Sequence, residues 1–191
     1  AARGGDEYEA TVRSFAASDN PDIAWRARRA LAARGLVDAG AIEAWRSADG
    51  SGEAARMSVE ALASLPIEEA RRHAWESVYS ETLSNDFLTA TLAGLQASSW
   101  EGEPGIEAAV DRLRSYWESH TIGMALRYAN GVLAYGLDSD RDGSVSRSVG
   151  LLRSWLDTNS DAPAQLRRIV IEHLDAFERD ERVQRRWKQD Q

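Results

Sequence analysis

The chain has 191 residues, 43% of them hydrophobic and 28% charged, and its formal net charge at pH 7 is -8. A chain of this length buries roughly 70% of the surface that it exposes when unfolded, so one domain or one elongated array is expected. The acidic balance argues against a nucleic-acid or anionic-membrane partner, because phosphate groups are bound by clustered Lys and Arg. Cysteine is absent, which excludes a disulfide scaffold and suits a cytoplasmic location, and no apolar run approaches the ~20 residues that span a bilayer.

Helical periodicity and capping signals divide the N-terminal part into helices, and no stretch has the period-two alternation of a half-buried strand. A first helix is expected near residues 7–17. The second begins after Asn20 and Pro21 and ends at Gly35, because proline is harmless in a first turn and glycine closes a helix. Asp38 then caps a third, short helix.

Residues 51–64 form the next expected helix, with Ala55, Val59 and Leu62 aligned on one face. Pro66 ends this helix and begins its successor. A further helix follows a cap at Ser84.

Beyond the loop at residues 98–105 the apolar pattern is clearer. One stripe contains Ile106, Ala109, Val110, Leu113 and Trp117, and a second contains Ile122, Ala125, Leu126, Ala129 and Leu133. A polar run at residues 138–143 precedes a helix that includes Val149. Asp161 and Pro163 begin the last helix, whose inward residues include His173.

The expected fold class is therefore all-α. Grouped by starts near residues 21, 51, 84, 121 and 161, the helices form pairs at the spacing of helical-repeat arrays. No self-similarity between repeats is visible. We therefore expect a degenerate HEAT- or armadillo-like array of antiparallel pairs, which forms a curved superhelix with a concave surface.

Several short segments, spread over most of the chain, together carry a resemblance to a known protein family. They are Asp22, Ile23, Ala24 and Trp25 with Leu31, Gly35 and Asp49; Leu65 and Pro66 with Ala74 and Trp75; Thr82, Leu83, Ser84 and Asn85; Arg114, Tyr116 and Trp117; and residues 159–170 with Glu172, Asp175 and Arg179. The last segment is the most specific, and none is a catalytic signature. Together they resemble the C-terminal helical domain of bacterial aminopeptidase N, a zinc aminopeptidase family related to the endoplasmic-reticulum and puromycin-sensitive aminopeptidases.

This resemblance implies a multidomain parent that removes N-terminal residues from peptides. The last domain of such enzymes is a bowl of helix pairs that encloses the active-site cavity, gates peptide access and helps to position the peptide. Residues 1–191 would be a single α-helical domain, a C-terminal fragment that lacks one or more initial helix pairs, so that Tyr8, Val12 and Phe15 face a missing neighbour. The implied partners are the catalytic domain of the same polypeptide and the peptide substrate, and the implied cofactor is zinc in that catalytic domain.

The chain itself shows no zinc motif. The H-E-x-x-H motif needs two His one helical turn apart, whereas His73, His120 and His173 are far apart in sequence. No catalytic or metal-binding residue is therefore assigned, and the isolated chain is expected to be inactive. His173 is expected to be a buried histidine satisfied by hydrogen bonds rather than a ligand or proton-transfer group.

Residues 138–145 copy the first eight positions of an EF-hand calcium loop, with Asp138, Asp140 and Asp142 as the oxygen ligands and Gly143 at position six. Position twelve is Val149 instead of the bidentate Glu. A solvated loop between helices is therefore favoured, and a weak cation site is the alternative.

Two other functions remain open from the sequence. The chain could be a free-standing helical-repeat scaffold that binds a protein, or a small calcium-responsive helical protein. Substrate-binding residues are unknown, although Arg71, Arg127 or Arg167 could receive a peptide carboxylate through bidentate bonding. The basic tail at residues 179–188 is interpreted as a solvated helix end rather than an anion site.

Overall fold

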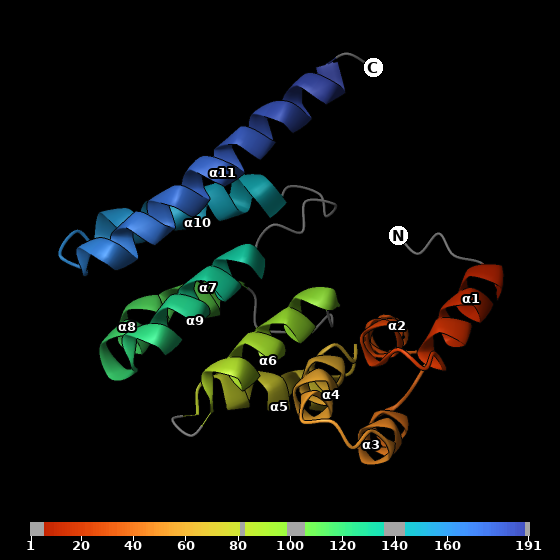
Figure 1. Ribbon diagram of the computed structural model, residues 1–191. Coiled ribbons are helices and arrows are strands. Elements are labelled where there is room, and N and C mark those ends of the chain that lie inside the picture. Colours follow the sequence, from red (N-terminus) through yellow and green to blue (C-terminus); the bar gives the residue numbers. More distant parts are fainter. Residues whose placement is uncertain (1–5, 81–82, 99–105, 136–143, 190–191) are drawn as a thin grey trace. The chain divides into compact units, whose positions relative to one another are not determined.

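The computed structural model describes residues 6–80, 83–98, 106–135 and 144–189 (Figure 1). In these ranges the regular structure consists of eleven α-helices without a strand, which confirms the all-α prediction. The chain divides into two compact units, residues 1–103 and residues 104–191. A single domain over residues 1–191 stays a prediction.

The first unit is built around α4. Its helices are α1 (Asp6–Ala16), α2 (Pro21–Ala33), α3 (Ala39–Ala48), α4 (Glu53–Ala63), α5 (Glu68–Val78) and α6 (Asn85–Ala97). Helix α4 packs against α2, α3, α5 and α6, while α1 packs on α2. Trp25, Ile42 and Leu65 are almost fully buried in the core that these helices share.

The predicted helix ends of this unit are confirmed by their capping contacts. The Asn20 side chain accepts hydrogen bonds from the backbone N–H groups of Asp22 and Ile23, and Asp38 accepts one from Ala41. Gly35 follows α2 with a φ of 66°, a left-handed conformation that favours glycine. Local sequence therefore determines where these helices begin and end.

The buried face of α4 differs from the predicted stripe. Ala54, Ser58 and Ala61 are buried, whereas Val59 and Leu62 are only half-buried. This face packs against α2 and α3, because Ala54 and Ala61 belong to the same core cluster as Trp25 and Ile42. On another side of α4, α6 approaches closely: a Cβ atom at Gly94 would lie 2.7 Å from Ala63 Cβ and would also clash with the Glu60 carbonyl oxygen. Only a small side chain such as that of Ala63 fits between two helices at this separation.

The second unit contains α7 (Ile106–Asp111), α8 (Leu113–Ser119), α9 (Ile122–Tyr135), α10 (Ser144–Thr158) and α11 (Ala164–Gln189). Helix α9 packs against α7, α8 and α11, and α10 packs against α7 and α11. Its fully buried residues include Leu113, Leu133, Leu152, Leu166 and Phe177. Tyr128 is buried as well and donates its hydroxyl to the Ala109 carbonyl oxygen at 2.8 Å.

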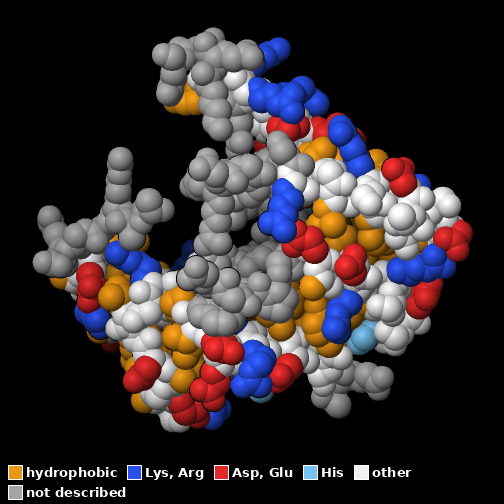
Figure 2. Space-filling view, turned by 180° about the vertical axis from the view of Figure 1, so that it is seen from behind, with side chains coloured by type: hydrophobic (Ala, Val, Ile, Leu, Met, Phe, Trp, Pro, Cys, Tyr) orange, Lys and Arg blue, Asp and Glu red, His pale blue; other side chains and the backbone are white. Residues whose placement is uncertain are grey.

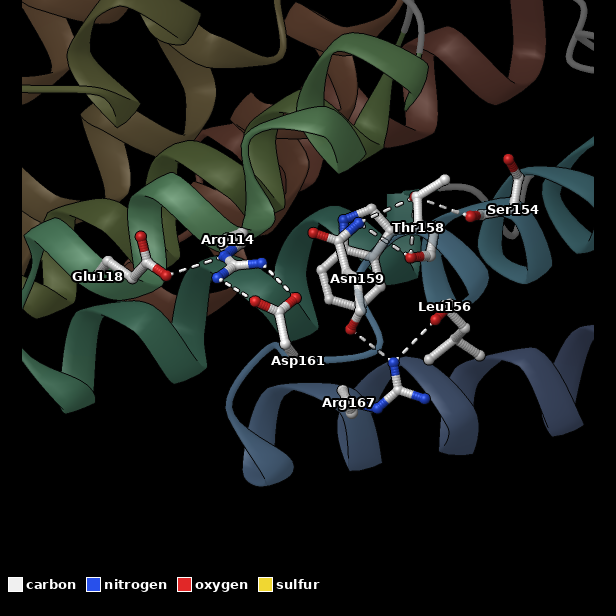
Figure 3. Close-up of polar contacts among 9 residues, drawn as sticks. Arg114, Glu118, Ser154, Leu156, Thr158, Asn159, Asp161 and Arg167 are labelled. Atoms are coloured by element: carbon white, nitrogen blue, oxygen red, sulfur yellow. Dashed lines mark hydrogen bonds and ion pairs between the residues drawn. The ribbon is translucent and has the colours of Figure 1, made fainter.

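Arginine side chains hold the turn between α10 and α11 (Figure 3). Arg114 of α8 donates to both carboxylate oxygens of Asp161, at 2.8 and 3.1 Å, and its Nε donates to Glu118. Arg167 Nη1 donates to the carbonyl oxygens of Leu156 and Asn159, which lie at the end of α10. The turn is therefore fixed from both sides by charged hydrogen bonds.

Candidate functional site

A cleft of about 590 Å³ lies between α4, α5 and α6 in the first unit. This volume is in the range of small-molecule and side-chain binding sites. Its walls are mostly apolar, and the larger apolar residues among them are Val59, Leu62, Leu65, Ile67, Leu83 and Phe87. Figure 2 shows that apolar side chains also reach the surface between charged ones on the face drawn there.

The cleft follows from the packing of α4. Helix α4 approaches α6 closely where Ala63 meets Gly94, and the half-buried Val59 and Leu62 line the cleft. Ile67 caps α5 in an extended conformation and is 48% exposed. The cleft thus presents large apolar side chains that the fold leaves only partly covered, which is typical of a binding surface.

The rim of the cleft carries the charged residues Glu69, Arg72, His73 and Glu76. Arg72 Nη1 lies 3.3 Å from Glu76 Oε1 in an exposed pair that contributes little to stability. With two carboxylates and one guanidinium, the rim is acidic when His73 is neutral. A ligand with an apolar group and a neighbouring positive charge would suit this arrangement.

The polar groups in the cleft wall are already used within their own helices. Thr91 donates its hydroxyl to the Phe87 carbonyl oxygen and Ser77 donates to that of Ala74, each at 2.8 Å. The wall therefore recognises shape and apolar surface rather than a pattern of hydrogen bonds.

The arginines considered as carboxylate receptors are placed differently from one another. Arg71 is buried and donates to the carbonyl oxygens of Ala63 and Leu95, so it reaches no open surface. Arg167 is half-buried and caps α10 as described above. Arg127 is exposed and donates to the Gly123 carbonyl oxygen at 3.0 Å. Two of the three candidates thus serve the fold.

The three histidines occupy separate places. His73 is exposed at the cleft rim. His120, at the end of α8, stacks on Tyr116 with ring centroids 3.8 Å apart, and its Nδ1 contacts the Ser119 hydroxyl. His173 of α11 is half-buried with its Nε2 3.4 Å from Asn130 Oδ1, and burial lowers its pKa while Glu172 raises it.

Among the side chains that the structure describes, no three His, Asp or Glu residues gather closely enough to hold a metal ion. Asp138, Asp140 and Asp142 lie outside the described residues. For that loop we expect a calcium dissociation constant no tighter than about millimolar, because position twelve lacks a carboxylate. Within the described ranges, none of the helices has the length and apolar character needed to cross a membrane.

Several residues of the aminopeptidase-like series make contacts between helices. Trp25 donates its indole N–H to Asp49 Oδ2 at 2.8 Å, which ties α2 to the end of α3. Arg114 binds Asp161, and Arg167 caps α10, as described for the second unit. These five residues therefore hold the helical scaffold.

No family model matches the chain, and no curated protein matches it.

Proposed function

We propose that this chain is the C-terminal helical domain of a zinc aminopeptidase and that the α4–α6 cleft binds an apolar side chain of the peptide substrate. The cleft is the observation that carries this proposal, because it combines large, half-buried apolar side chains with an acidic rim. A peptide with a basic residue beside its apolar side chain suits that rim. The zinc, its ligands and the general base belong to the catalytic domain of the parent, so the isolated chain is inactive.

The resemblance supports the aminopeptidase part of the proposal. Residues that are distant in sequence but belong to the same resemblance series, such as Trp25 with Asp49 and Arg114 with Asp161, are bonded to each other. We further propose that the helices form a HEAT- or armadillo-like superhelix, which encloses the active-site cavity of the parent and gates peptide access in the cytoplasm.

The proposed role is positional. A cleft remote from the scissile bond cannot take part in the zinc chemistry, but it can hold the peptide chain and limit its motion. Binding energy of this kind lowers the barrier when it orients the reacting end of the peptide. A peptide that reaches the cleft should therefore be hydrolysed better than one that does not.

Peptide binding to the isolated chain tests the proposal directly. The probe is a fluorescently labelled decapeptide that contains a central Phe-Lys pair, compared with the same peptide containing Ser-Lys. Fluorescence anisotropy should show tighter binding of the Phe peptide, and L62Q should weaken that binding by about tenfold, since it removes roughly one buried side chain from the contact.

The matched control is I23Q, because Ile23 is 43% exposed on α2 and does not line the cleft. This variant should bind like the wild type. Equal affinity for the Phe and Ser peptides would contradict a binding cleft. A start codon directly before Ala1 in the gene would favour the free-standing scaffold over the aminopeptidase domain.

A further inference from the structure

The guanidinium of Arg28 on α2 lies against the rings of Trp25 and Trp45. Its guanidinium carbon lies 5.0 Å from the ring centroid of Trp25 and 5.2 Å from that of Trp45. Its Nε donates to the Ala16 carbonyl oxygen at 3.1 Å, at the end of α1. Three contacts from three helices therefore fix the direction of this side chain.

The outer edge of the guanidinium lacks an acceptor. Among the residues that the structure describes, neither Nη atom of Arg28 has a hydrogen-bond acceptor and Arg28 forms no ion pair. Asp49 is the nearby carboxylate, but its oxygens accept from the Trp25 indole and the Ser51 backbone N–H. Burial lowers the pKa of Arg28 and Asp49 raises it, so a partly desolvated positive charge is only partly compensated.

A hollow of about 240 Å³ adjoins this guanidinium. It is lined by Arg13, Ala16, Ala17, Arg28, Leu31 and Trp45, which include two cations and no carboxylate. Arg13 uses its Nε for Glu9 and one Nη for the Leu36 carbonyl oxygen. A neighbouring hollow that shares Arg28 and Trp45 is lined by Asp19 and Asp49, whose charges would repel an anion.

We propose that the hollow lined by Arg13, Arg28 and Trp45 binds an oxyanion, namely a carboxylate on a small planar group. The two Nη atoms of Arg28 form a fork that matches the two oxygens of a carboxylate. The Trp45 ring offers a flat apolar wall for the group that carries it. Arg13, which is paired with Glu9, lies at the edge of the hollow. This site is independent of the α4–α6 cleft and of the proposed peptidase role.

Benzoate and benzamide are the matched probes, because they differ in charge but hardly in shape. Binding to the whole chain is followed through tryptophan fluorescence and the indole N–H signals of Trp25 and Trp45 in NMR spectra, at low ionic strength because salt screens exposed charges. Benzoate should bind with a dissociation constant on the order of millimolar, at least ten times more tightly than benzamide. A parallel titration with inorganic phosphate shows whether the site prefers a carboxylate or a phosphate group.

Two kinds of variant locate the site. R28Q should weaken benzoate binding at least tenfold, but it also removes the contacts with both indoles and Ala16. A17E avoids that difficulty, because Ala17 is exposed after the end of α1 and a glutamate there places the chain's own carboxylate beside Arg28. A17E should weaken benzoate binding at least tenfold, whereas A17Q should change it less than twofold.

Each outcome decides a point. Tighter binding of benzoate than of phosphate supports a ligand with a planar carboxylate. Tighter binding of phosphate than of benzoate assigns the same oxyanion site to a phosphate group. The proposal is overturned if benzamide binds as well as benzoate, if neither anion binds, or if A17E binds benzoate as the wild type does.

Discussion

Three arginines share one structural role at the residue scale, which is to satisfy carbonyl groups at the ends of helices. Arg28 donates to Ala16 at the end of α1, Arg71 to Ala63 and Leu95 near the ends of α4 and α6, and Arg167 to Leu156 and Asn159 at the end of α10. The last carbonyl groups of a helix lack intrahelical partners and carry partial negative charge. A long cationic side chain donates hydrogen bonds to these carbonyl groups and offsets their partial negative charge.

Arg71 should therefore be essential for stability. Its replacement in R71M removes the donors from two buried carbonyl oxygens and should lower the free energy of unfolding by about 2–4 kcal/mol. The control is R72M, next in sequence but exposed and paired with Glu76 at the surface, which should change stability by less than about 0.5 kcal/mol. Urea unfolding followed by circular dichroism measures both, and similar losses in the two variants would contradict the capping role.

His173 should make stability depend on pH. Because burial lowers its pKa below the ordinary value of about 6.5, the unfolded chain takes up the proton more readily than the folded chain. The contribution of His173 is complete above the unfolded pKa and is lost as the pH falls through the folded pKa. Between pH 7.5 and 5, the wild type should lose more stability than H173Q does.

Urea unfolding of both proteins at several pH values checks this expectation. An identical pH dependence in the wild type and H173Q would show that His173 does not contribute.

At the scale of elements, α4 packs against α2 and α3 through Ala54 and Ala61 and approaches α6 at Gly94. The sequence predicted α4 correctly within a few residues, but the stripe of Ala55, Val59 and Leu62 that it aligned is not the most deeply buried face. Periodicity favours the face with the larger apolar residues, Val59 and Leu62, because it weighs hydrophobicity and not the distance between helices. Gly94 on α6 permits a close approach to Ala63, and this signal lies far from α4 in sequence.

Gly94 should consequently tolerate no added methyl group. G94A should lower the free energy of unfolding by about 1–3 kcal/mol, since the new Cβ meets the backbone of α4 as well as Ala63. Gly150 on α10 is the matched control, because an added Cβ there meets no atom within 4 Å. G150A should stabilise the chain by up to about 1 kcal/mol through helix propensity alone.

Thermal and urea unfolding of the two variants give the comparison. The two changes are chemically identical and both lie in helices, so a difference in sign reports the space around each glycine. Stabilisation by G94A would show that α4 and α6 do not approach each other as closely as described.

At the scale of the whole molecule, the sequence predicts the helical scaffold much better than the candidate sites. Helix ends follow from local signals such as Asn20, Gly35 and Asp38, and these were predicted correctly. The cleft and the Arg28 hollow each require side chains from several segments, and their apolar and charged residues look like ordinary helix faces in sequence. Only the tertiary arrangement separates Arg71, which is buried in the scaffold, from Arg28, whose outer edge is open.

The proposed role in a parent aminopeptidase leads to a prediction that depends on substrate length. A single-residue anilide occupies only the catalytic centre, whereas a longer peptide can also reach the α4–α6 cleft. In the parent enzyme, L62Q should therefore lower kcat/KM for long peptides with a suitably placed apolar residue by about threefold to tenfold, and it should leave the anilide unaffected. I23Q should alter neither reaction, because Ile23 lies outside the cleft.

Steady-state kinetics on an anilide and a series of peptides of increasing length provide the measurement. Loss of activity on both substrates in L62Q would mean that the helical domain supports the catalytic domain as a whole, whereas a loss that begins at one peptide length would give the reach from the zinc to the cleft.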